Sequence, residues 1–329
     1  MLFENFTSLI DGKLLNEPSI ASFSNIIFEL KKVKTGDLFI GKKTEIKQAI
    51  EQGAYGVVST SLKVKDEEIA WIEVDSLNSV KQKLIRYLII KSGLNILFLN
   101  DIEFQILSLL IDKNTILSLD DNTQSVINSL QNFSHDNIIL SCEEKLLNFL
   151  DLEPLVVVEK YSITVTKYTT FLTTFTYKDN YYKDIKLPKI FIPNLQKVLN
   201  FLDDLNISYT LNRLNFINHF KPIFIDSYFK IKPFGQSRKV LILENDIKLI
   251  KQEQEYINKC ASWANIALVV PTQLENQFKN IKQIYTYKNF SDIKTIDISN
   301  INFIIVLDIE LKYESYLIKK SNEIKGTLF

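Results

Sequence analysis

The sequence has few of the residues that build metal, disulfide and hydrolase sites. Its 329 residues include two cysteines, Cys142 and Cys260, and two histidines, His135 and His219. It contains no CxxC, HExxH or GxSxG pattern, so neither a zinc site nor a serine-hydrolase elbow is supported and no metal is expected. Two cysteines far apart in the sequence indicate buried free thiols in a reducing compartment.

An excess of charge is absent as well. Lys plus Arg and Asp plus Glu number 39 each, and a neutral chain has no general attraction to phosphate backbones or anionic lipids. The basic cluster Lys31, Lys32 and Lys34 is soon followed by Asp37. Such clusters are interpreted as solvated faces, with a phosphate site as the alternative, and no nucleic acid partner is expected.

Long hydrophobic runs are also lacking. The longest apolar stretches, at 95–99 and 302–307, have the length of strands and are too short to cross a bilayer. The first residues carry acids and no basic region before an apolar run, so no signal peptide is expected. These features predict a cytoplasmic protein without a membrane span.

The 46% of apolar residues and the length allow two or three domains with real cores. Strand and helix signals alternate, which favours an α/β architecture. In the first segment the expected strands are 38–40, 55–59 and 70–74, and the expected helices are 45–52 and 79–90. Gly53 suits the left-handed end of the first helix, and Asn78 is the expected N-cap of the second.

The middle of the chain combines α/β signals with a β-rich stretch. The expected strands are 96–99 and 138–141, and the expected helices are 102–111, 123–133 and 193–205, with Asp101 as an N-cap. Residues 155–187 predict an antiparallel hairpin or meander with a turn at Asp179 and Asn180. Their many aromatic residues fit a base-stacking platform or a half-buried sheet face, and the lack of positive charge favours the latter.

The last third predicts a small parallel sheet covered on both faces. The expected strands are 239–243, 266–270, 283–287 and 303–307, and the expected helices are 247–261, 274–278 and 311–322. Pro271 is expected to end the second of these strands.

Several patterns resemble those of the Mur ligases, in the same order along the chain. Val33, Gly36, Asp37, Leu38 and Phe39 match the family pattern V-x-x-G-D-L-F, and Ala49, Gly53, Ala54 and Val57 match A-x-x-x-G-A-x-x-V. Further similarity follows at 162–202, 225–228 and 238–270. The resemblance implies a small N-terminal α/β domain (1–92), a shortened central domain with a β-rich second half (93–220), and a C-terminal Rossmann-like parallel sheet (221–329). It also implies a bacterial protein linked to peptidoglycan.

The chain departs from the family where ligands bind. A working Mur ligase carries a G-x-x-G-K-[ST] loop after the first central strand, which holds ATP phosphates and magnesium. Here the corresponding positions are Asn100, Asp101 and Glu103, in a stretch without Gly, Lys, Ser or Thr. The central domain is shortened, and Lys31 and Phe229 occupy positions where the family has Arg and Asn. The resemblance therefore implies a retained scaffold with lost chemistry and no cofactor.

Three hypotheses follow. The first is a catalytically inactive Mur-ligase-like protein that binds an unknown protein partner, for binding or scaffolding near peptidoglycan precursor synthesis or the cell envelope. The second is an ATP-dependent amide ligase acting on UDP-muramoyl peptides with a divergent nucleotide site, for which the candidate residues are Asp226, Tyr228, Arg238 and Glu244. Gly235 and Ser237 form either an anion-binding turn or a connecting turn. The third is a UDP-sugar-binding module with phosphate contacts from Lys31, Thr35 and Lys42.

Overall fold

A computed structural model describes residues 1–93, 96–112, 116–118, 123–131, 138–141, 158–278, 283–308 and 312–318. The chain divides into two compact units, Met1–Asn100 with Asp112–Val156 and Asp101–Ile111 with Val157–Phe329. The strands of the described residues form four sheets with parallel and antiparallel pairs, so the predicted α/β class is confirmed. The division at 1–92, 93–220 and 221–329 stays a prediction.

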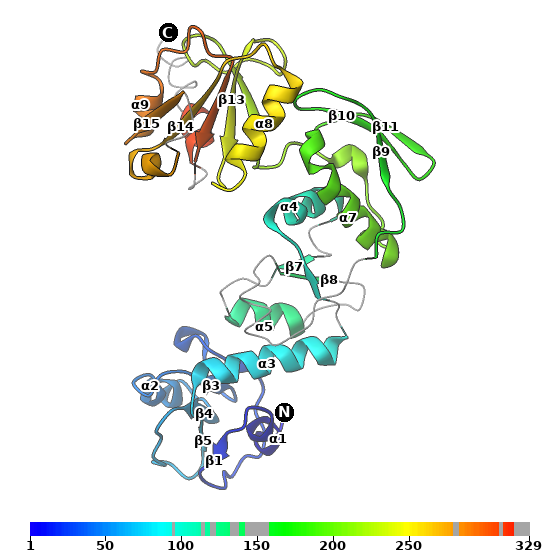
Figure 1. The fold of residues 1–329 in the computed structure, drawn as a ribbon. Coiled ribbons are helices and arrows are strands. Elements are labelled where there is room, and N and C mark those ends of the chain that lie inside the picture. The colour runs from blue at the N-terminus through cyan, green and yellow to red at the C-terminus, as the bar shows by residue number, and fades with distance from the viewer. Residues whose placement is uncertain are drawn as a thin grey trace, which may run out of the picture. The chain divides into compact units, whose positions relative to one another are not determined.

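The first unit contains a five-stranded sheet with the strand order β1-β5-β4-β3-β2 (Figure 1). The strands are β1 (Lys13–Leu14), β2 (Ile26–Ile27), β3 (Leu38–Ile40), β4 (Gly56–Ser59) and β5 (Ala70–Glu73). The helices around it are α1 (Phe3–Leu9), η1 (Leu30–Lys32), α2 (Ile46–Glu51) and α3 (Leu77–Ser92). The strands and helices predicted for this segment are confirmed, with ends that differ by one or two residues.

Both faces of this sheet are buried. Neighbouring residues of a strand point to opposite sides, and residues of β3 pack into a core on each side. Leu38 and Ile40 of β3 belong to the core on the side of α1 and α3. Phe39, between them, packs with Ala49 of α2 on the other side. The short strands therefore need no polar face.

The first unit also contains a three-stranded parallel sheet with the strand order β6-β8-β7. Its strands are β6 (Ile96–Phe98), β7 (Ile116–Ser118) and β8 (Ile138–Ser141), and the helix α5 (Thr123–Gln131) lies between the last two in sequence. The buried amide of Gln124 accepts a hydrogen bond from Phe28 N and donates one to Ile26 O. These bonds fix α5 beside β2.

The expected N-cap of α3 was wrong. The helix begins at Leu77, and the cap is Ser76, whose hydroxyl accepts a hydrogen bond from Ser79 N. Ser76 has the extended backbone (φ −149°, ψ 127°) that an N-cap requires, whereas Asn78 lies inside the first turn.

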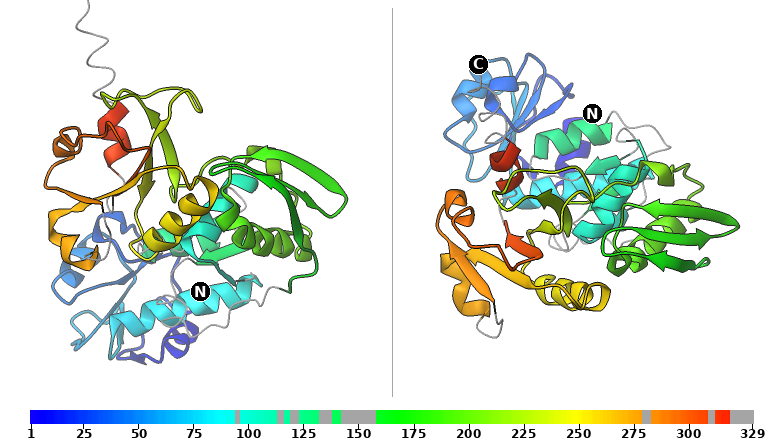
Figure 2. Two further views of the ribbon diagram at one scale, coloured as in Figure 1. Left: turned by 45° about the horizontal axis from the view of Figure 1, so that its top comes forward. Right: turned by 90° about the horizontal axis from the view of Figure 1, so that it is seen from above.

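The second unit begins with α4 (Asp101–Leu110), which packs against α7 (Ile192–Asp204). A three-stranded antiparallel meander of β9 (Ile163–Tyr168), β10 (Thr173–Tyr177) and β11 (Asn180–Ile185) lies beside α7 (Figures 1 and 2). Tyr177 of β10 donates a hydrogen bond of 2.7 Å from its hydroxyl to Asp203 of α7. The predicted meander is confirmed, with its turn at Lys178 and Asp179, one residue before the expected position. The interior position of Phe175 and Tyr177 fits a half-buried sheet face.

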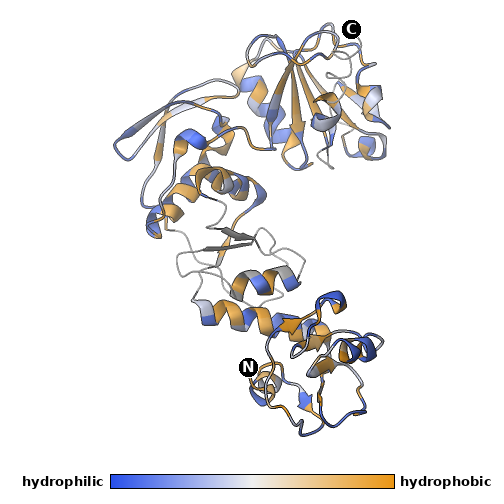
Figure 3. Cartoon of the chain, turned by 180° about the vertical axis from the view of Figure 1, so that it is seen from behind, coloured by the Kyte–Doolittle hydropathy of each residue, from blue (hydrophilic) through white to orange (hydrophobic). Residues whose placement is uncertain are grey.

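The larger sheet of the second unit has the order β12-β13-β16-β14-β15, and only β12 is antiparallel. Its strands are β12 (Lys221–Ile225), β13 (Lys239–Glu244), β14 (Ile266–Pro271), β15 (Ile284–Tyr287) and β16 (Phe303–Leu307). The helical elements are η3 (Lys189–Phe191), η4 (Leu211–Arg213), α8 (Ile250–Cys260), η5 (Thr272–Phe278), α9 (Phe290–Ile293) and residues 313–318. Figure 3 shows the strands as largely hydrophobic, as expected for a sheet buried on both faces.

Two details of this region differ from expectation. The predicted helix at 274–278 is the 3-10 helix η5, and α8 begins at Ile250, later than predicted. Cys260 is a half-buried free thiol, whereas Cys142 lies outside the described residues, as does the end of the helix expected at 311–322.

Candidate functional site

The residues that match the first Mur-ligase pattern hold the fold together. The carboxylate of Asp37 is buried, and it accepts hydrogen bonds of 2.9 Å from Asn25 Nδ2 and Lys34 N. Gly36, before it, has a φ of +93°, a conformation that glycine adopts at little cost. Asp37 therefore closes the turn that leads into β3, and its side chain is fully engaged within the protein.

The second pattern is also structural. Ala49, Ala54 and Val57 are buried, and Gly53 ends α2 with a φ of +99°. A Cβ atom on Gly53 would lie 2.7 Å from Thr35 Oγ1 and 3.0 Å from Thr35 Cα. The close approach of these two segments requires glycine.

The three residues expected to contact a UDP-sugar lie at two ends of one strand. Lys31 and Thr35 precede β3 and Lys42 follows it, and all three side chains are exposed. A strand of this length spans roughly 10 Å. The structure therefore does not bring Lys42 next to the other two, and their ligand role stays a prediction.

The candidates of the ligase hypothesis also separate. Ile225 pairs with Lys239 across β12 and β13, so Asp226, Tyr228 and Arg238 lie at one end of this strand pair. Glu244 lies at the other end of β13, about 17 Å from Lys239 at the usual rise of a strand.

Asp226 is occupied by its own loop. Its Oδ1 accepts hydrogen bonds from Tyr228 N and Lys230 N, and its Oδ2 lies 3.1 Å from Lys232 Nζ. Burial tends to raise the pKa of Asp226, but these bonds outweigh it and lower the pKa. The side chain of Tyr228 is 83% exposed, which makes it a surface residue rather than part of a formed pocket.

The turn that contains Ser237 connects two strands. The Ser237 hydroxyl donates to Ile225 O and accepts from Lys239 N. These bonds support the interpretation of a connecting turn over that of an anion-binding turn.

The connection after β6 is short. β6 ends at Phe98 and α4 begins at Asp101, so only Leu99 and Asn100 lie between them. A phosphate-binding loop wraps several backbone N–H groups around a triphosphate before the helix starts. Two residues, of which Leu99 is buried, are too few for such a loop.

Two carboxylates occupy the first turn of α4. Asp101 Oδ2 lies 2.7 Å from His219 Nε2 and accepts a hydrogen bond from Gln105 Nε2. Glu103 is 4% exposed and pairs with Lys197 of α7 at 2.9 Å. Asp101 was expected to be the N-cap, the residue before the helix, but it is the first residue of the helix. Negative side chains here satisfy the positive end of the helix dipole that a phosphate would otherwise use.

His219 lies buried between two carboxylates. Its Nδ1 is 2.7 Å from Glu244 Oε1, opposite the contact with Asp101. Burial alone lowers the pKa of His219, but the hydrogen bonds to Asp101 and Glu244 outweigh this effect and raise the pKa to about 9. His219 is therefore a cation at neutral pH. Because both ring nitrogens are engaged, it offers no lone pair to a metal or to a substrate proton.

Glu244 is fully buried and well satisfied. In addition to His219, it accepts hydrogen bonds from Phe220 N, Asn245 N and Asp246 N. Burial raises its pKa, and the bond to His219 more than compensates, so the pKa of Glu244 is lowered and the group is an anion.

Glu253 of α8 has the opposite character. It is fully buried, and its carboxyl oxygens accept no hydrogen bond from the described residues. Burial and the neighbouring Glu244 carboxylate raise the pKa of Glu253 well above its usual range. Glu253 is therefore a neutral acid beside the His219 and Glu244 pair.

The sequence did not single out His219. It belongs to no motif, and its partners lie 118 and 25 residues away. The antiparallel pairing of β12 with β13, which places Phe220 opposite Glu244, brings His219 to this position.

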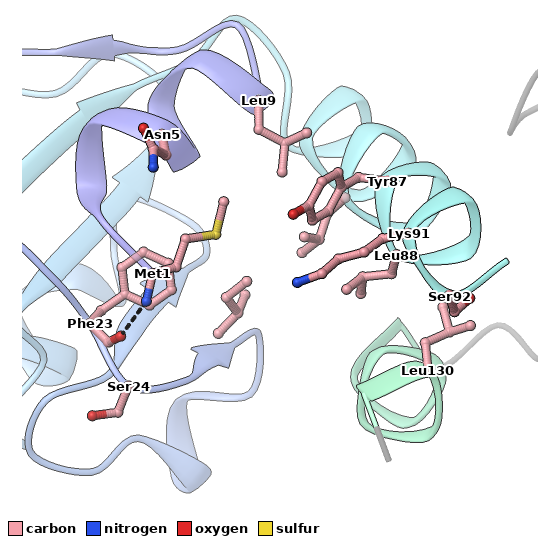
Figure 4. Close-up of a pocket in the computed structure, with 12 residues that line it drawn as sticks. Met1, Asn5, Leu9, Phe23, Ser24, Tyr87, Leu88, Lys91, Ser92 and Leu130 are labelled. Carbon is pink, nitrogen blue, oxygen red and sulfur yellow. Dashed lines mark hydrogen bonds between the residues drawn. The ribbon is translucent and has the colours of Figure 1, made fainter. Parts of the chain in front are cut away.

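A cavity of about 770 Å³ lies in the first unit, between α1 and the segment at Phe23 on one side and α3 with α5 on the other. Figure 4 shows that Tyr87 and Lys91 project from α3 toward Met1 and Phe23. The lining is mostly apolar and includes none of the predicted site residues.

A second cavity, of about 520 Å³, lies at the carboxyl ends of β14, β15 and β16. Pro271, Tyr287 and the buried Asp308 line it. Open α/β sheets bind ligands at this kind of edge.

Within the part of the chain that the structure describes, no group of three or more His, Cys, Asp and Glu side chains is arranged to hold a metal ion. In the same residues, no helix combines the length and the apolar character needed to span a bilayer.

Comparison with solved structures gives matches along nearly the whole chain. MurF from Acinetobacter baumannii is 9% identical, with a TM-score of 0.59 and coverage of 97% of this chain and 98% of that chain. MurF ligase from Thermotoga maritima in complex with ADP is 12% identical, with a TM-score of 0.60 and coverage of 92% and 98%. A UDP-N-acetylmuramoyl-L-alanyl-D-glutamate–2,6-diaminopimelate ligase is 11% identical, with a TM-score of 0.51 and coverage of 98% and 99%. No family model and no curated protein sequence matches. The chain has the fold of the Mur ligases.

Proposed function

We propose that this chain, with the fold of the Mur ligases, is a catalytically inactive Mur-ligase-like protein. In this proposal it has a binding or scaffold role linked to peptidoglycan precursor synthesis or the cell envelope. It acts in the cytoplasm, with a protein partner still to be identified.

The start of α4 carries the proposal. Its two-residue connection to β6 leaves no backbone loop for phosphates, and Asp101 and Glu103 stand where an anion would be held. The protein's own cations, His219 and Lys197, are already paired with these carboxylates. A triphosphate at this position would find no backbone loop around it, and both of these cations would be engaged with carboxylates.

The pattern of retention and loss also supports the proposal. The matched residues that remain, such as Asp37 and Gly53, have structural roles in turns and helix ends. The positions that differ from the family pattern are those at which a ligase would hold its ligands. A scaffold needs the first group of residues and has no use for the second.

The direct test is ATP–magnesium binding to the purified full chain, measured by isothermal titration calorimetry and by thermal unfolding. We expect no heat and no change in Tm at 1 mM ATP. If ATP did bind, and this concentration were about 100 times its Kd, it would stabilise the folded state by about 2.7 kcal/mol, which both methods would detect. MurF ligase from Thermotoga maritima, whose structure contains ADP, is the positive control. Micromolar affinity in this chain would refute the proposal.

The alternative is an ATP-dependent amide ligase acting on UDP-muramoyl peptides with a divergent nucleotide site. The cavity at the carboxyl ends of β14, β15 and β16 favours it, because ligands bind at that edge of α/β sheets. ADP formation in the presence of a UDP-muramoyl peptide and D-alanyl-D-alanine would establish the alternative. Its absence, together with a partner captured on the intact chain, is the result that the scaffold role predicts.

A UDP-sugar remains a candidate ligand of the first unit through Lys31, Thr35 and Lys42. Saturating UDP-sugar should raise Tm if it binds the folded chain, and an unchanged Tm would count against this ligand.

A further inference from the structure

A third cavity, of about 440 Å³, opens on the α2 side of the first unit. It is formed by α2, by the segment after β4 and by Trp71 of β5. None of the residues proposed above for ATP, UDP-sugar or ligase chemistry lines it. Its size is within the range of small-molecule sites, about 300–1,000 Å³.

The floor of this pocket is apolar and fixed in place. Ile46, Leu62 and Trp71 form one buried cluster, and Ile50 packs against it from the next turn of α2. Trp71 Nε1 donates a hydrogen bond of 2.7 Å to Asp66 O, which fixes the orientation of the indole. The floor exists before any ligand arrives, so little ordering is required on binding.

The rim is positively charged. Four lysines line the pocket, with two acidic residues: Lys43, Lys47, Lys63, Lys65, Glu51 and Asp66. Lys63 and Lys65 are exposed, and neither has a carboxylate within 4 Å among the described residues. They are the cations available to a bound anion.

The other charged groups of the rim are partly engaged. Lys43 Nζ donates to Ser61 O, and Lys47 makes a long contact of 3.7 Å with Glu51. Asp66 Oδ1 accepts a hydrogen bond from Glu68 N. The rim thus retains a surplus of positive charge over an apolar floor.

We propose that this pocket binds a small anionic amphiphile. The apolar body of the ligand packs on Ile46, Ile50 and Leu62, and its phosphate or carboxylate group binds at Lys63 and Lys65. This binding is independent of the scaffold role, because it involves no residue of α4.

The test uses octyl phosphate below its micelle concentration, with octyl glucoside and inorganic phosphate as matched probes of the tail alone and of the charge alone. The chain has two tryptophans, and Trp263 is 68% exposed on the other unit. In a Trp263→Phe background the emission therefore reports on Trp71 at the pocket floor. We expect a saturable change with octyl phosphate, at least tenfold weaker binding of octyl glucoside, and no change with inorganic phosphate.

Two variants separate the proposal from nonspecific binding. The double variant Lys63→Gln/Lys65→Gln changes exposed residues only, and it should weaken octyl phosphate binding at least tenfold while leaving octyl glucoside unchanged. The control Lys183→Gln/Lys186→Gln removes the same charge from exposed residues of the other unit and should change neither. Equal affinity of the wild type and the pocket variant for octyl phosphate, equal binding of octyl glucoside, or no saturable signal would overturn the proposal.

Discussion

His219 Nδ1 lies 2.7 Å from Glu244 Oε1, in the interior of the second unit. The antiparallel register of β12 and β13, with Lys221 opposite Leu243, brings the residues before β12 to the end of β13. The bond therefore follows from the strand pairing. On the other side of the ring, His219 binds Asp101, so one buried cation joins the start of α4 to the large sheet.

Loss of the buried partner should cost much more stability than loss of the exposed one. Glu244→Gln leaves the His219 cation without its buried counter-ion, and breaking a buried pair typically costs about 3–5 kcal/mol. Asp101→Asn is the matched control, because the Asp101 side chain is 54% exposed and a partly solvated pair is worth about 1 kcal/mol or less. Urea unfolding of both variants measures the difference. Similar losses in the two variants would show that the buried pair of His219 with Glu244 contributes no more stability than the pair of His219 with Asp101.

Stability should depend on pH through His219. Its pKa is raised from 6.5 to about 9 in the folded chain. Because the folded pKa is the higher one, the stabilisation is fully present below pH 6.5 and is lost as the pH rises through 9. The difference in Tm between the wild type and His219→Gln should therefore be largest at pH 6 and should shrink toward pH 10. A difference that is constant over this range would contradict a charged His219.

Glu253→Gln should stabilise the chain at neutral pH. Burial and Glu244 raise the pKa of Glu253, so the folded state holds a proton that the unfolded state releases above its ordinary pKa of 4.5. Stability due to this group falls as the pH rises above 4.5. Glutamine has nearly the same shape and does not titrate, so it removes this loss. Thermal unfolding at pH 5 and pH 8 should show a larger gain at pH 8. An equal gain at both values would mean that Glu253 does not titrate.

Glycine should be required at Gly53 for two reasons and at Gly93 for one. Both have a positive φ, but a Cβ at Gly53 would approach Thr35 Oγ1 to 2.7 Å, whereas at Gly93 no described atom lies within 4 Å. Gly93→Ala should cost about 1 kcal/mol for the left-handed backbone alone. Gly53→Ala should cost about 1–3 kcal/mol more, because overpacking adds to it. Equal values in chemical unfolding would show that the matched pattern does not require this close contact.

Most strands and helices could be predicted because their signals are local. The apolar run at 303–307 became β16 and the hydrophobic spacing at 193–205 became α7, since burial decides both. Helix starts were less predictable. α3 begins at Leu77 because Ser76 has the extended backbone and the free hydroxyl of a cap, although Asn78 is as good a capping residue in isolation.

Of the candidate site, only the loss of the phosphate loop could be predicted from the sequence. The composition after Phe98 already indicated the loss of a phosphate loop, because that loss is a matter of residue types. The pairing of Asp101 with His219 could not be predicted, since it depends on contacts across 118 residues. The lysine pocket around Trp71 was missed for the same reason, as its rim comes from separate segments of the chain.

The position of α4 in the sequence has a consequence for the order of folding. The segment Asp101–Ile111 belongs to the second unit, while the segments on either side of it belong to the first. During synthesis α4 emerges more than a hundred residues before His219, its partner 118 positions later. Its apolar face, with Ile106 and Leu107 buried in the finished structure, must wait for α7 and the large sheet to be made. The nascent first unit therefore carries a hydrophobic helix without its final contacts, and such exposed apolar surface favours aggregation at this stage of synthesis.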